Sequence, residues 1–275
     1  MSETLKINRS GYYRWIKEGM MSRREIPESE LLEWIKGVFN ESKQRYGSPR
    51  ITAELRAKGM KVSKNRVARI MKKHGIKSKI KRRFKITTNS KHKLPVAENL
   101  VDMKFNPESA NSLWASDITY IRTLEGWLYL AVVLDLWSRA VIGWCIDRFM
   151  DESLVIRAMD QAIANRPRNE DLIFHSDRGS QYASSNVRAL LQQNEINQSM
   201  SSKGNCYDNA VVESFFSTFK RELVYTETFR TREEAKLKIF EYIEIFYNRK
   251  RRHSKLGYLS PLDFEKLNII LLNHS

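Results

Sequence analysis

This 275-residue sequence has few cysteines and no long apolar stretch, and its first residues are not apolar. Its two cysteines, Cys145 and Cys206, are too few for a disulfide framework or a cysteine-based zinc site, so both classes are excluded. The best apolar stretch, Trp127–Leu134, is too short to cross a membrane and ends at Asp135. The first 20 residues mix Lys, Arg and Glu and lack a signal-peptide core. We therefore expect a soluble, cytoplasmic protein with no membrane partner.

Acidic residues are also scarce in one block of the chain. Residues 41–100 contain 19 Lys and Arg against only three Glu, and this block accounts for the whole net charge of +16. Such a concentration of positive charge is the electrostatic footprint of a surface that binds a polyanion. A solvated face or a linker is the plainer explanation of a basic run, but the helical pattern inside the block favours nucleic-acid binding.

Two short helices with a glycine turn between them are predicted inside the basic block. The first is Arg50–Lys58, which Gly59 ends as a left-handed cap, and the second is Lys64–His74, which Ser63 caps and Gly75 ends. This order is typical of a helix-turn-helix, although a plain helical hairpin remains the alternative. We expect the outer face of the second helix to contact DNA. Its side chains are those of Lys64, Asn65, Arg66, Arg69, Lys72 and Lys73.

The segments on either side of these helices are simpler. Glu28–Glu41 has the apolar spacing of an amphipathic helix. Lys77–Lys93 is basic and aperiodic, which predicts a flexible linker that lies along phosphates through residues such as Arg82 and Arg83.

Three carboxylates occupy positions that suggest a catalytic role. Asp117 lies inside an aromatic and β-branched strand, Asp177 follows a short apolar strand, and Glu213 lies on the first turns of a helix that also carries Lys220. An acid inside a strand is costly unless it is paired or bound to metal. Three gathered carboxylates repel each other, and two divalent cations would relieve this while clamping the oxygens of a phosphodiester. The spacing alone does not show that the three acids meet.

The motifs around these acids resemble a known family. They are W-x-x-D-I-T at Asp117, H-S-D-R-G-S-Q-Y at Asp177, and N-x-x-x-E-S-F-F at Glu213, with Lys220 seven residues later and H-S-K-L-G-Y-L-S-P at 253–261. Together they resemble the DDE triad of bacterial transposases of insertion-sequence family three, which are related to retroviral integrases.

The resemblance implies a metal-dependent enzyme that cuts DNA strands and joins a 3′ hydroxyl to another phosphodiester. Asp117, Asp177 and Glu213 would be catalytic and would hold two Mg²⁺ ions, with Mn²⁺ as an alternative. Lys220 would hold a phosphate. DNA, a second copy of the chain on DNA, and an upstream reading-frame product or fusion are the implied partners, and the protein would join the nucleoid when bound. A structure-specific nuclease and a non-catalytic DNA-binding regulator from a decayed element are the alternatives.

The expected fold is α/β. The resemblance implies an RNase H-like core with a mixed five-stranded sheet and flanking helices, preceded by a small all-α helix-turn-helix domain. In that fold the strands that carry Asp117 and Asp177 are neighbours. The expected divisions are an N-terminal helical segment (1–44), the helix-turn-helix domain (45–80), a basic linker (81–107), the catalytic core (108–225) and a C-terminal helical extension (226–275).

Several further predictions concern single segments near the acids. Ser199–Asn205 is small and polar, which indicates a mobile loop that meets DNA through Lys203 or, in the plainer interpretation, an ordinary connection. Asp135 is a rival acid for which a turn hydrogen bond or an ion pair is the ordinary role. His175 could order a metal site or serve the structure.

The C-terminal region is predicted as a long helix with a basic end. Thr231–Tyr247 has helical spacing, with Leu237 and Phe240 among its inward residues and Glu244 toward solvent. Residues 247–253 would form a second basic cluster for DNA or another subunit.

Overall fold

The computed structural model describes residues 26–80, 95–101, 105–167, 169–202 and 210–272. The chain divides into two compact units, one that runs to Ser78 and one that begins at Lys79. Among the described residues, no helix has the length and apolar character needed to cross a membrane. The finer division into five parts stays a prediction.

The first unit is built from three helices. They are α2 (Glu28–Glu41), α3 (Ser48–Ala57) and α4 (Lys64–Lys73), and both α2 and α3 pack against α4. The hydroxyl of Ser63 accepts a hydrogen bond from the backbone of α4 and caps it, as the sequence predicted. Gly59 has a φ of 85°, a left-handed conformation that suits glycine and ends α3. The predicted helix, turn and helix are therefore present, and α2 belongs to the same unit.

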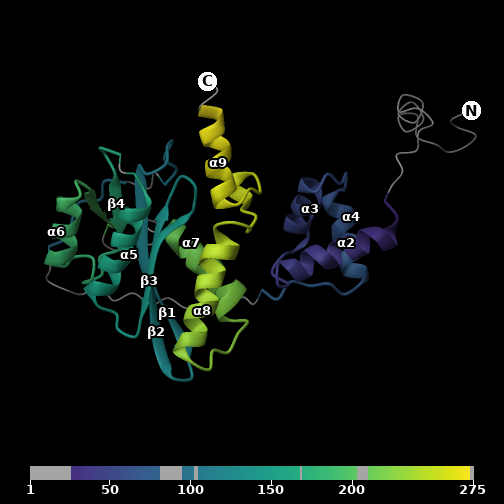
Figure 1. Cartoon of the computed structure of the whole chain (residues 1–275), viewed down its shortest axis with the longest axis horizontal. Helices are drawn as coiled ribbons and strands as arrows, with labels where there is room; N and C mark the ends of the chain where they lie inside the picture. Colours follow the sequence, from purple (N-terminus) through teal and green to yellow (C-terminus); the bar gives the residue numbers. More distant parts are fainter. Residues whose placement is uncertain (1–25, 81–94, 102–104, 168, 203–209, 273–275) are drawn as a thin grey trace, which may run out of the picture. The chain divides into compact units, whose positions relative to one another are not determined.

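The second unit contains a mixed five-stranded sheet (Figure 1). Its strands are β1 (Leu113–Thr123), β2 (Gly126–Asp135), β3 (Val141–Asp147), β4 (Ile173–Ser176) and β5 (Asn197–Met200). The strand order is β3-β2-β1-β4-β5, with β1, β2 and β3 antiparallel and β4 and β5 parallel to β1. The predicted five-stranded mixed sheet and the predicted contact between the strands of Asp117 and Asp177 are both confirmed.

Helices cover both faces of this sheet. In Figure 1, α5 and α6 lie on one side of it, and α7 and α8 lie on the other. The helical elements are α5 (Glu152–Asn165), α6 (Ser185–Gln193), α7 (Ala210–Phe219), a π-helical segment (Lys220–Val224), α8 (Arg232–Phe240), a second π-helical segment (Glu241–Tyr247), a 3₁₀ turn (Ser254–Leu256) and α9 (Pro261–Leu272).

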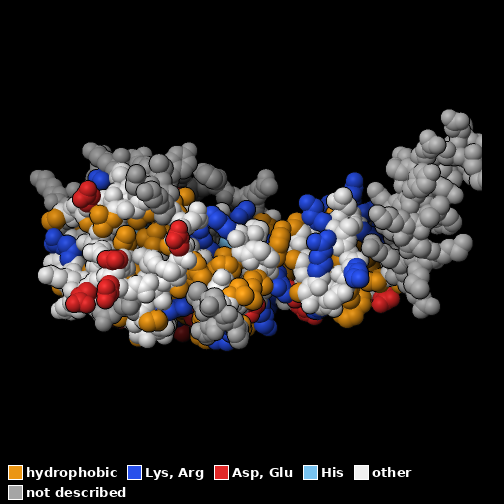
Figure 2. Space-filling model, turned by 90° about the horizontal axis from the view of Figure 1, so that it is seen from above, with side chains coloured by type: hydrophobic (Ala, Val, Ile, Leu, Met, Phe, Trp, Pro, Cys, Tyr) orange, Lys and Arg blue, Asp and Glu red, His pale blue; other side chains and the backbone are white. Residues whose placement is uncertain are grey.

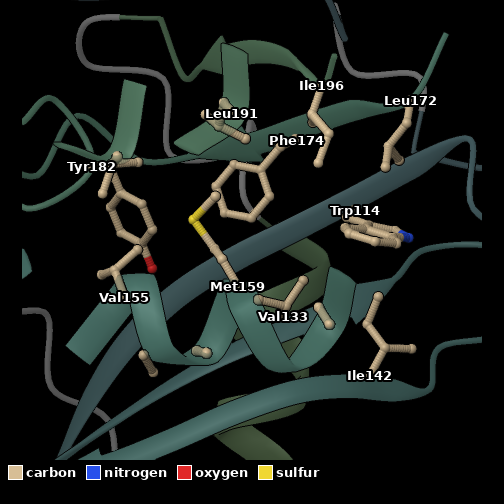
Figure 3. Close-up of a cluster of buried hydrophobic side chains, with 14 of the residues drawn as sticks. Trp114, Val133, Ile142, Val155, Met159, Leu172, Phe174, Tyr182, Leu191 and Ile196 are labelled. Atoms are coloured by element: carbon tan, nitrogen blue, oxygen red, sulfur yellow. The ribbon is translucent and has the colours of Figure 1, made fainter. Parts of the chain in front are cut away.

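The main core lies between the sheet and α5 and α6. Trp114, Val133, Met159 and Phe174 are fully buried there and point toward one another (Figure 3). Gly143 lets β3 approach α5 closely, because a Cβ at this position would lie only 2.2 Å from the backbone oxygen of Ala158. The packing of α5 fixes one face of the sheet and leaves the other for α7.

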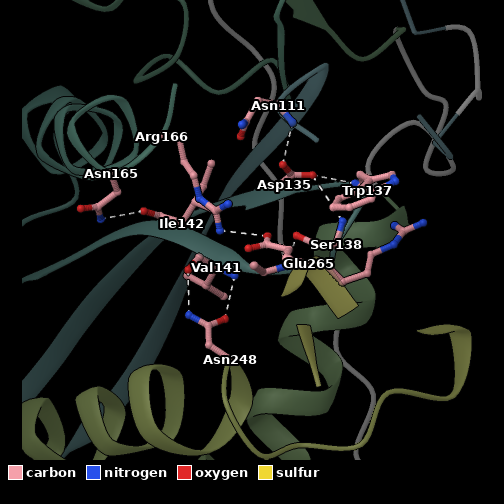
Figure 4. A network of polar contacts seen from close by, with 12 residues as sticks. Asn111, Asp135, Trp137, Ser138, Val141, Ile142, Asn165, Arg166, Asn248 and Glu265 are labelled. Atoms are coloured by element: carbon pink, nitrogen blue, oxygen red, sulfur yellow. Dashed lines mark hydrogen bonds and ion pairs between the residues drawn. The ribbon is translucent and has the colours of Figure 1, made fainter. Parts of the chain in front are cut away.

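The outer edge of β3 is closed by side-chain amides. Asn248 accepts from the backbone N–H of Val141 at 3.0 Å and donates to its carbonyl at 2.9 Å, and Asn165 donates to the carbonyl of Ile142 at 3.2 Å (Figure 4). Gln161 accepts from the N–H of Trp144 at 2.7 Å. These contacts occupy backbone groups that would otherwise be open to pairing with another strand.

The C-terminal helices differ from the prediction in which residues they bury. Leu237 and Phe240 are 70% and 49% exposed, not inward. Ala235, Ile239 and Ile243, which were also predicted to be inward, are buried. At about 100° per residue, Leu237 lies on the opposite side of α8 from Ala235, and Phe240 lies about 100° beyond Ile239. Glu244, predicted to face solvent, accepts a hydrogen bond from the indole of Trp144 at 2.7 Å.

The predicted basic cluster at 247–253 is corrected in part, because Arg249 and Lys250 are exposed but other members are not. Tyr247, Asn248 and Arg251 are buried. Arg251 forms a two-pronged ion pair with buried Glu222, with both N–O distances at 2.9 Å, and the hydroxyl of Tyr242 donates to the same carboxylate. Arg251 therefore joins the two π-helical segments and is not a surface cation.

Candidate active site

Asp117 and Asp177 lie beside each other at the sheet. The parallel register of β1 and β4 ends with Ser116 opposite Ser176, and the two aspartates are the next residue on each chain. Side chains at matching positions of adjacent strands point to the same face. That face is the one on which α7, the helix that carries Glu213, contacts β1. The fold thus brings the three predicted acids to one side of β1.

The electrostatics of Asp117 indicate how close the acids are. Burial, and then the negative charge of Asp177, raise the pKa of the Asp117 carboxyl group to about 8. Glu213 raises it further by a smaller amount, and burial raises the pKa of Glu213 itself. Across the described part of the chain, no three His, Cys, Asp or Glu side chains are close enough together to hold a metal ion. Of the two neighbouring acids, Asp177 therefore influences Asp117 more strongly than Glu213 does.

Lys220 is a cation that interacts with Asp117. It begins the π-helical segment after α7, and its Nζ lies 4.9 Å from the centre of the Tyr120 ring. Burial lowers the pKa of Lys220, an effect that Tyr120 and Asp117 partly offset. The positive charge of Lys220 in turn opposes the rise in the pKa of Asp117. Lys220 is thus placed where an anion at the acids would meet it.

The turn after β4 holds Asp177 in position. One carboxylate oxygen of Asp177 accepts the backbone N–H of Gly179 at 2.9 Å. A Cβ on Gly179 would lie 3.0 Å from that same oxygen, so this approach favours glycine. The guanidinium of Arg178 donates to the carbonyl of Ser201 at 2.6 Å, which ties the turn to the chain that leaves β5.

Two buried polar contacts support the aspartate pair from within. The hydroxyls of Ser116 and Tyr182 lie 2.8 Å apart, which links the residue before Asp117 to the segment that follows Asp177. His175 is fully buried, with Nδ1 2.9 Å from the hydroxyl of Ser199 and Nε2 3.4 Å from that of Ser201. Because both ring nitrogens lie within reach of hydroxyls, the structure favours the structural role for His175.

The serines beside His175 correct one prediction. Ser199 was predicted to begin a mobile loop, but Ser199 and Met200 belong to β5 and are buried. The small polar residues face His175, so their composition reflects packing in a strand. The rest of the predicted loop from Lys203 onward, with Cys206, lies outside the described residues.

Asp135, the rival acid, has a structural role. Its side chain is fully buried and accepts the backbone N–H groups of Asn111 at 2.8 Å and Trp137 at 2.7 Å (Figure 4). These bonds tie the start of β1 to the turn that follows β2. The ordinary role that the sequence suggested for Asp135, a hydrogen-bonded turn, is therefore confirmed.

The predicted DNA-contact residues of the first unit are only partly free on its surface. Lys64, Asn65, Arg69 and Lys72 are exposed, whereas Arg66 is half-buried and donates to the carbonyl of Ile26. Lys73, although exposed, pairs with Glu28 at 2.7 Å. In Figure 2, Lys and Arg side chains stand out on the visible face of this unit. Arg82 and Arg83 lie outside the described residues.

Sequence reasoning missed the residues that support the acids. Nothing in the spacing showed that Ser116 and Tyr182 meet, or that Glu222 and Arg251 pair inside the protein. Tyr182 does end the H-S-D-R-G-S-Q-Y motif, five residues after Asp177, so its position in the motif was an available signal.

Family models match most of the chain. A model described as an HTH-like domain matches residues 27–84, and models described as integrase core domains match residues 107–206 and 213–269. These matches agree with the helical unit and with the sheet and helices that follow it. They define a protein with an HTH-like domain and an integrase core.

Similar proteins make the family specific. Transposase InsF for insertion sequence IS3A of Escherichia coli (strain K12) is 45% identical over 270 residues, which cover 98% of this chain and 94% of that protein. The insertion element IS600 uncharacterized 31 kDa protein of Shigella sonnei is 42% identical over 266 residues, 97% of each chain. Among solved structures, the catalytic core domain of BIV integrase is similar to 60% of this chain and 99% of that chain, at 17% identity and a TM-score of 0.43. The chain belongs to the IS3 family of insertion-sequence transposases.

Proposed function

We propose that this chain catalyses metal-dependent DNA strand cleavage and strand transfer, with Asp117, Asp177 and Glu213 as its catalytic and metal-binding residues. The observation that carries the proposal is the aspartate pair formed where the chain leaves β4 beside Asp117 inside β1, with the pKa of Asp117 raised to about 8. A carboxyl pair of this kind is costly in the absence of cations, and strongly shifted acids are typical of functional sites. Membership of a transposase family supports the same reaction.

The residues present fit divalent cations. Oxygen ligands from carboxylates are what Mg²⁺ and Mn²⁺ prefer, and a positive charge would favour the ionised form of Asp117. Asp117 and Asp177 would share a cation, and Glu213 would complete the set from α7. Bound cations would supply the Lewis acidity that activates a water or a 3′ hydroxyl and stabilises the leaving oxygen.

The chain's other residues would bind and orient the DNA. Lys220, between Asp117 and Tyr120, would hold a backbone phosphate as a point charge. The exposed side chains of α4 would bind the element end, with Arg82, Arg83 and Lys203 as further proposed contacts. Two element ends must be joined in one reaction, so we infer that the protein acts as an oligomer on DNA. A fusion with an upstream reading-frame product remains part of the proposal.

A strand-transfer assay tests the function. Wild-type protein and Glu213→Gln would be incubated with Mg²⁺ and a labelled element-end oligonucleotide that carries a free 3′ hydroxyl. We expect joined products from the wild type and a loss of about a thousandfold or more in the variant, equal to several kcal/mol of transition-state stabilisation. Glu227→Gln is the matched control, because Glu227 pairs with Lys238 on the surface, away from the acids.

The other outcomes would replace the proposal. Hydrolysis without joining would favour a structure-specific nuclease. DNA binding without either reaction would favour a non-catalytic regulator. Full activity in Glu213→Gln would remove Glu213 from the catalytic set.

A further inference from the structure

The β1–β2 hairpin exposes aromatic side chains on one face. Strand alternation places Ile118, Tyr120, Trp127 and Tyr129 on this face, which we call the hairpin aromatic face. The opposite face of the hairpin, which includes Ile121 and other apolar residues, is buried. A hairpin with one buried face ordinarily carries polar side chains on the other. Trp127 is nevertheless 47% exposed, so a large part of its side chain is open to solvent.

The rings of this face are held in fixed positions. The centres of the Tyr120 and Trp127 rings are 5.3 Å apart at an angle of 84°, an edge-to-face contact. Tyr129 lies directly across from Tyr120 in the ladder. Ile118 and Tyr129 also pack against the main core, which anchors the face at its inner end. The exposed ring of Trp127 is therefore presented on a rigid support.

Lysine and arginine side chains lie around the rings. Lys220 contacts the Tyr120 ring, and Arg122 is the cross-strand neighbour of Trp127. Of the nearby acids, the carboxylate of Glu125 accepts the backbone N–H of Arg232 at 2.8 Å, and that of Asp147 pairs with Arg157. Lys220 and Arg122 therefore place positive charge beside the aromatic face, and the carboxylate of Glu125 lies at the turn of the same hairpin.

Lys220 links this face to the acids. Asp117 and Tyr120 lie on opposite faces of β1 by alternation, yet Lys220 interacts electrostatically with both. The pairing of β1 with β4 ends at Ser116, so the edge of β1 is unpaired after this residue. Lys220 interacts with both side chains at this edge. A DNA strand whose phosphate met Lys220 at the acids would thus have the aromatic face beside its next nucleotides.

We propose that the hairpin aromatic face binds unpaired bases of a DNA strand next to the cleavage site, with Trp127 as the exposed stacking ring. Aromatic rings interleaved with Lys and Arg are how proteins bind single strands, through base stacking and phosphate contacts. The inference rests on the proposed function and adds to it a binding site for the part of one strand that is already unpaired at the DNA end. A second copy of the chain is less favoured as the partner of this face. A protein partner would not explain why positively charged side chains such as Lys220 lie between the rings and the acids.

Fluorescence anisotropy with the full chain tests this inference. The probes are a labelled blunt duplex and the same duplex with a short single-stranded thymidine overhang, both in EDTA so that no strand is cut. Trp127→Ala should weaken binding of the overhang duplex roughly tenfold and leave the blunt duplex unchanged, because one stacked base contributes between about fivefold and 150-fold. Trp127→Phe should retain most of the affinity. Phe240→Ala is the matched control, since that ring is exposed to 49% on α8 and should have no effect.

Each other result has a definite meaning. Equal binding of the overhang by wild type and Trp127→Ala, or equal weakening of both probes, would overturn the inference. A change in oligomeric state by sedimentation, with overhang binding unchanged, would assign the face to a second copy instead. If the wild type bound neither probe, the proposed function itself would fail. This outcome distinguishes failure of the proposed function from failure of the further inference alone.

Discussion

Asp117 is the residue at which protonation and metal binding oppose each other. Burial and the charge of Asp177 raise its pKa to about 8, so the neutral form is favoured near pH 7 when no cation is bound. A divalent cation at the aspartate pair would reverse this preference, because ligand carboxylates must be ionised. The ionised form of Asp117 is unfavourable in the metal-free protein, and a bound cation would therefore stabilise it strongly.

We expect Asp117→Asn to stabilise the metal-free protein increasingly as the pH rises. The pKa of Asp117 in the folded protein lies above the ordinary value of 3.8. Between these two values the folded protein keeps a proton that the unfolded chain has lost, so the stability of the wild type falls with rising pH. The advantage of Asn should therefore grow from pH 5 to pH 8, by up to about 1.4 kcal/mol per pH unit.

Urea unfolding in EDTA at pH 5 and pH 8 measures this difference. Asp160→Asn is the control, because Asp160 is exposed on α5 and should show no such trend. Adding Mg²⁺ should stabilise the wild type and have little effect on Asp117→Asn. A gain in stability that is the same at both pH values would contradict the assigned environment of Asp117.

At the scale of elements, the two π-helical segments depend on one buried ion pair. The segment that begins at Lys220 contains Glu222, and Arg251 follows the second segment. Burial alone would lower the pKa of Arg251, but the charge and hydrogen bonds of Glu222 more than offset this and raise it. The hydroxyl of Tyr242 completes the network. The ion pair attaches the first π-helical segment, which begins with Lys220, to the C-terminal part of the chain.

Breaking the pair on one side should destabilise the second unit strongly. Arg251→Met leaves the Glu222 carboxylate buried without its cation, and losses of this kind are about 3–5 kcal/mol. Replacing both residues, as Glu222→Gln with Arg251→Met, should recover much of that loss because no charge stays buried. The free energy of unfolding in urea gives both values.

An exposed pair provides the comparison. Lys236 and Glu233 lie 2.7 Å apart on the surface of α8, and Lys236→Ala should cost no more than about 1 kcal/mol. If Arg251→Met cost as little as Lys236→Ala, the network would not be a determinant of this region.

At the scale of the whole molecule, regular patterns and motifs were readable and long-range contacts were not. The bounds of α2 follow from apolar spacing, and the three acid motifs indicated the family before any fold was known. The burial of Arg251 could not be read from the sequence, because Lys-Arg-Arg at 250–252 has the composition of a surface cluster and its partner lies 29 positions away. Leu237 and Phe240 were misplaced because they are apolar but lie outside the buried stripe of Ala235 and Ile239 on α8, and apolar character alone did not show which face packs.

From the concentration of positive charge in residues 41–100 we predict how the affinity of the full chain for DNA depends on salt. If α4 lies against phosphates, each neutralised phosphate releases counterions and steepens the dependence of affinity on salt, by about 0.9 per phosphate in the log–log slope. Replacing exposed Lys64, Arg69 and Lys72 together by Ala should then reduce the slope by about one unit for each phosphate that is no longer neutralised.

A matched triple variant separates this effect from net charge. Arg188, Lys236 and Lys266 belong to the second unit, and replacing all three by Ala removes the same charge from α6, α8 and α9. Binding of a labelled blunt duplex across a salt titration should leave the slope of this control close to that of the wild type, because none of its three cations lies on α4, the helix proposed to contact phosphates. Equal changes in the two triple variants would mean that the protein attracts DNA through its overall charge, and α4 would then lose its proposed role as the helix that contacts DNA.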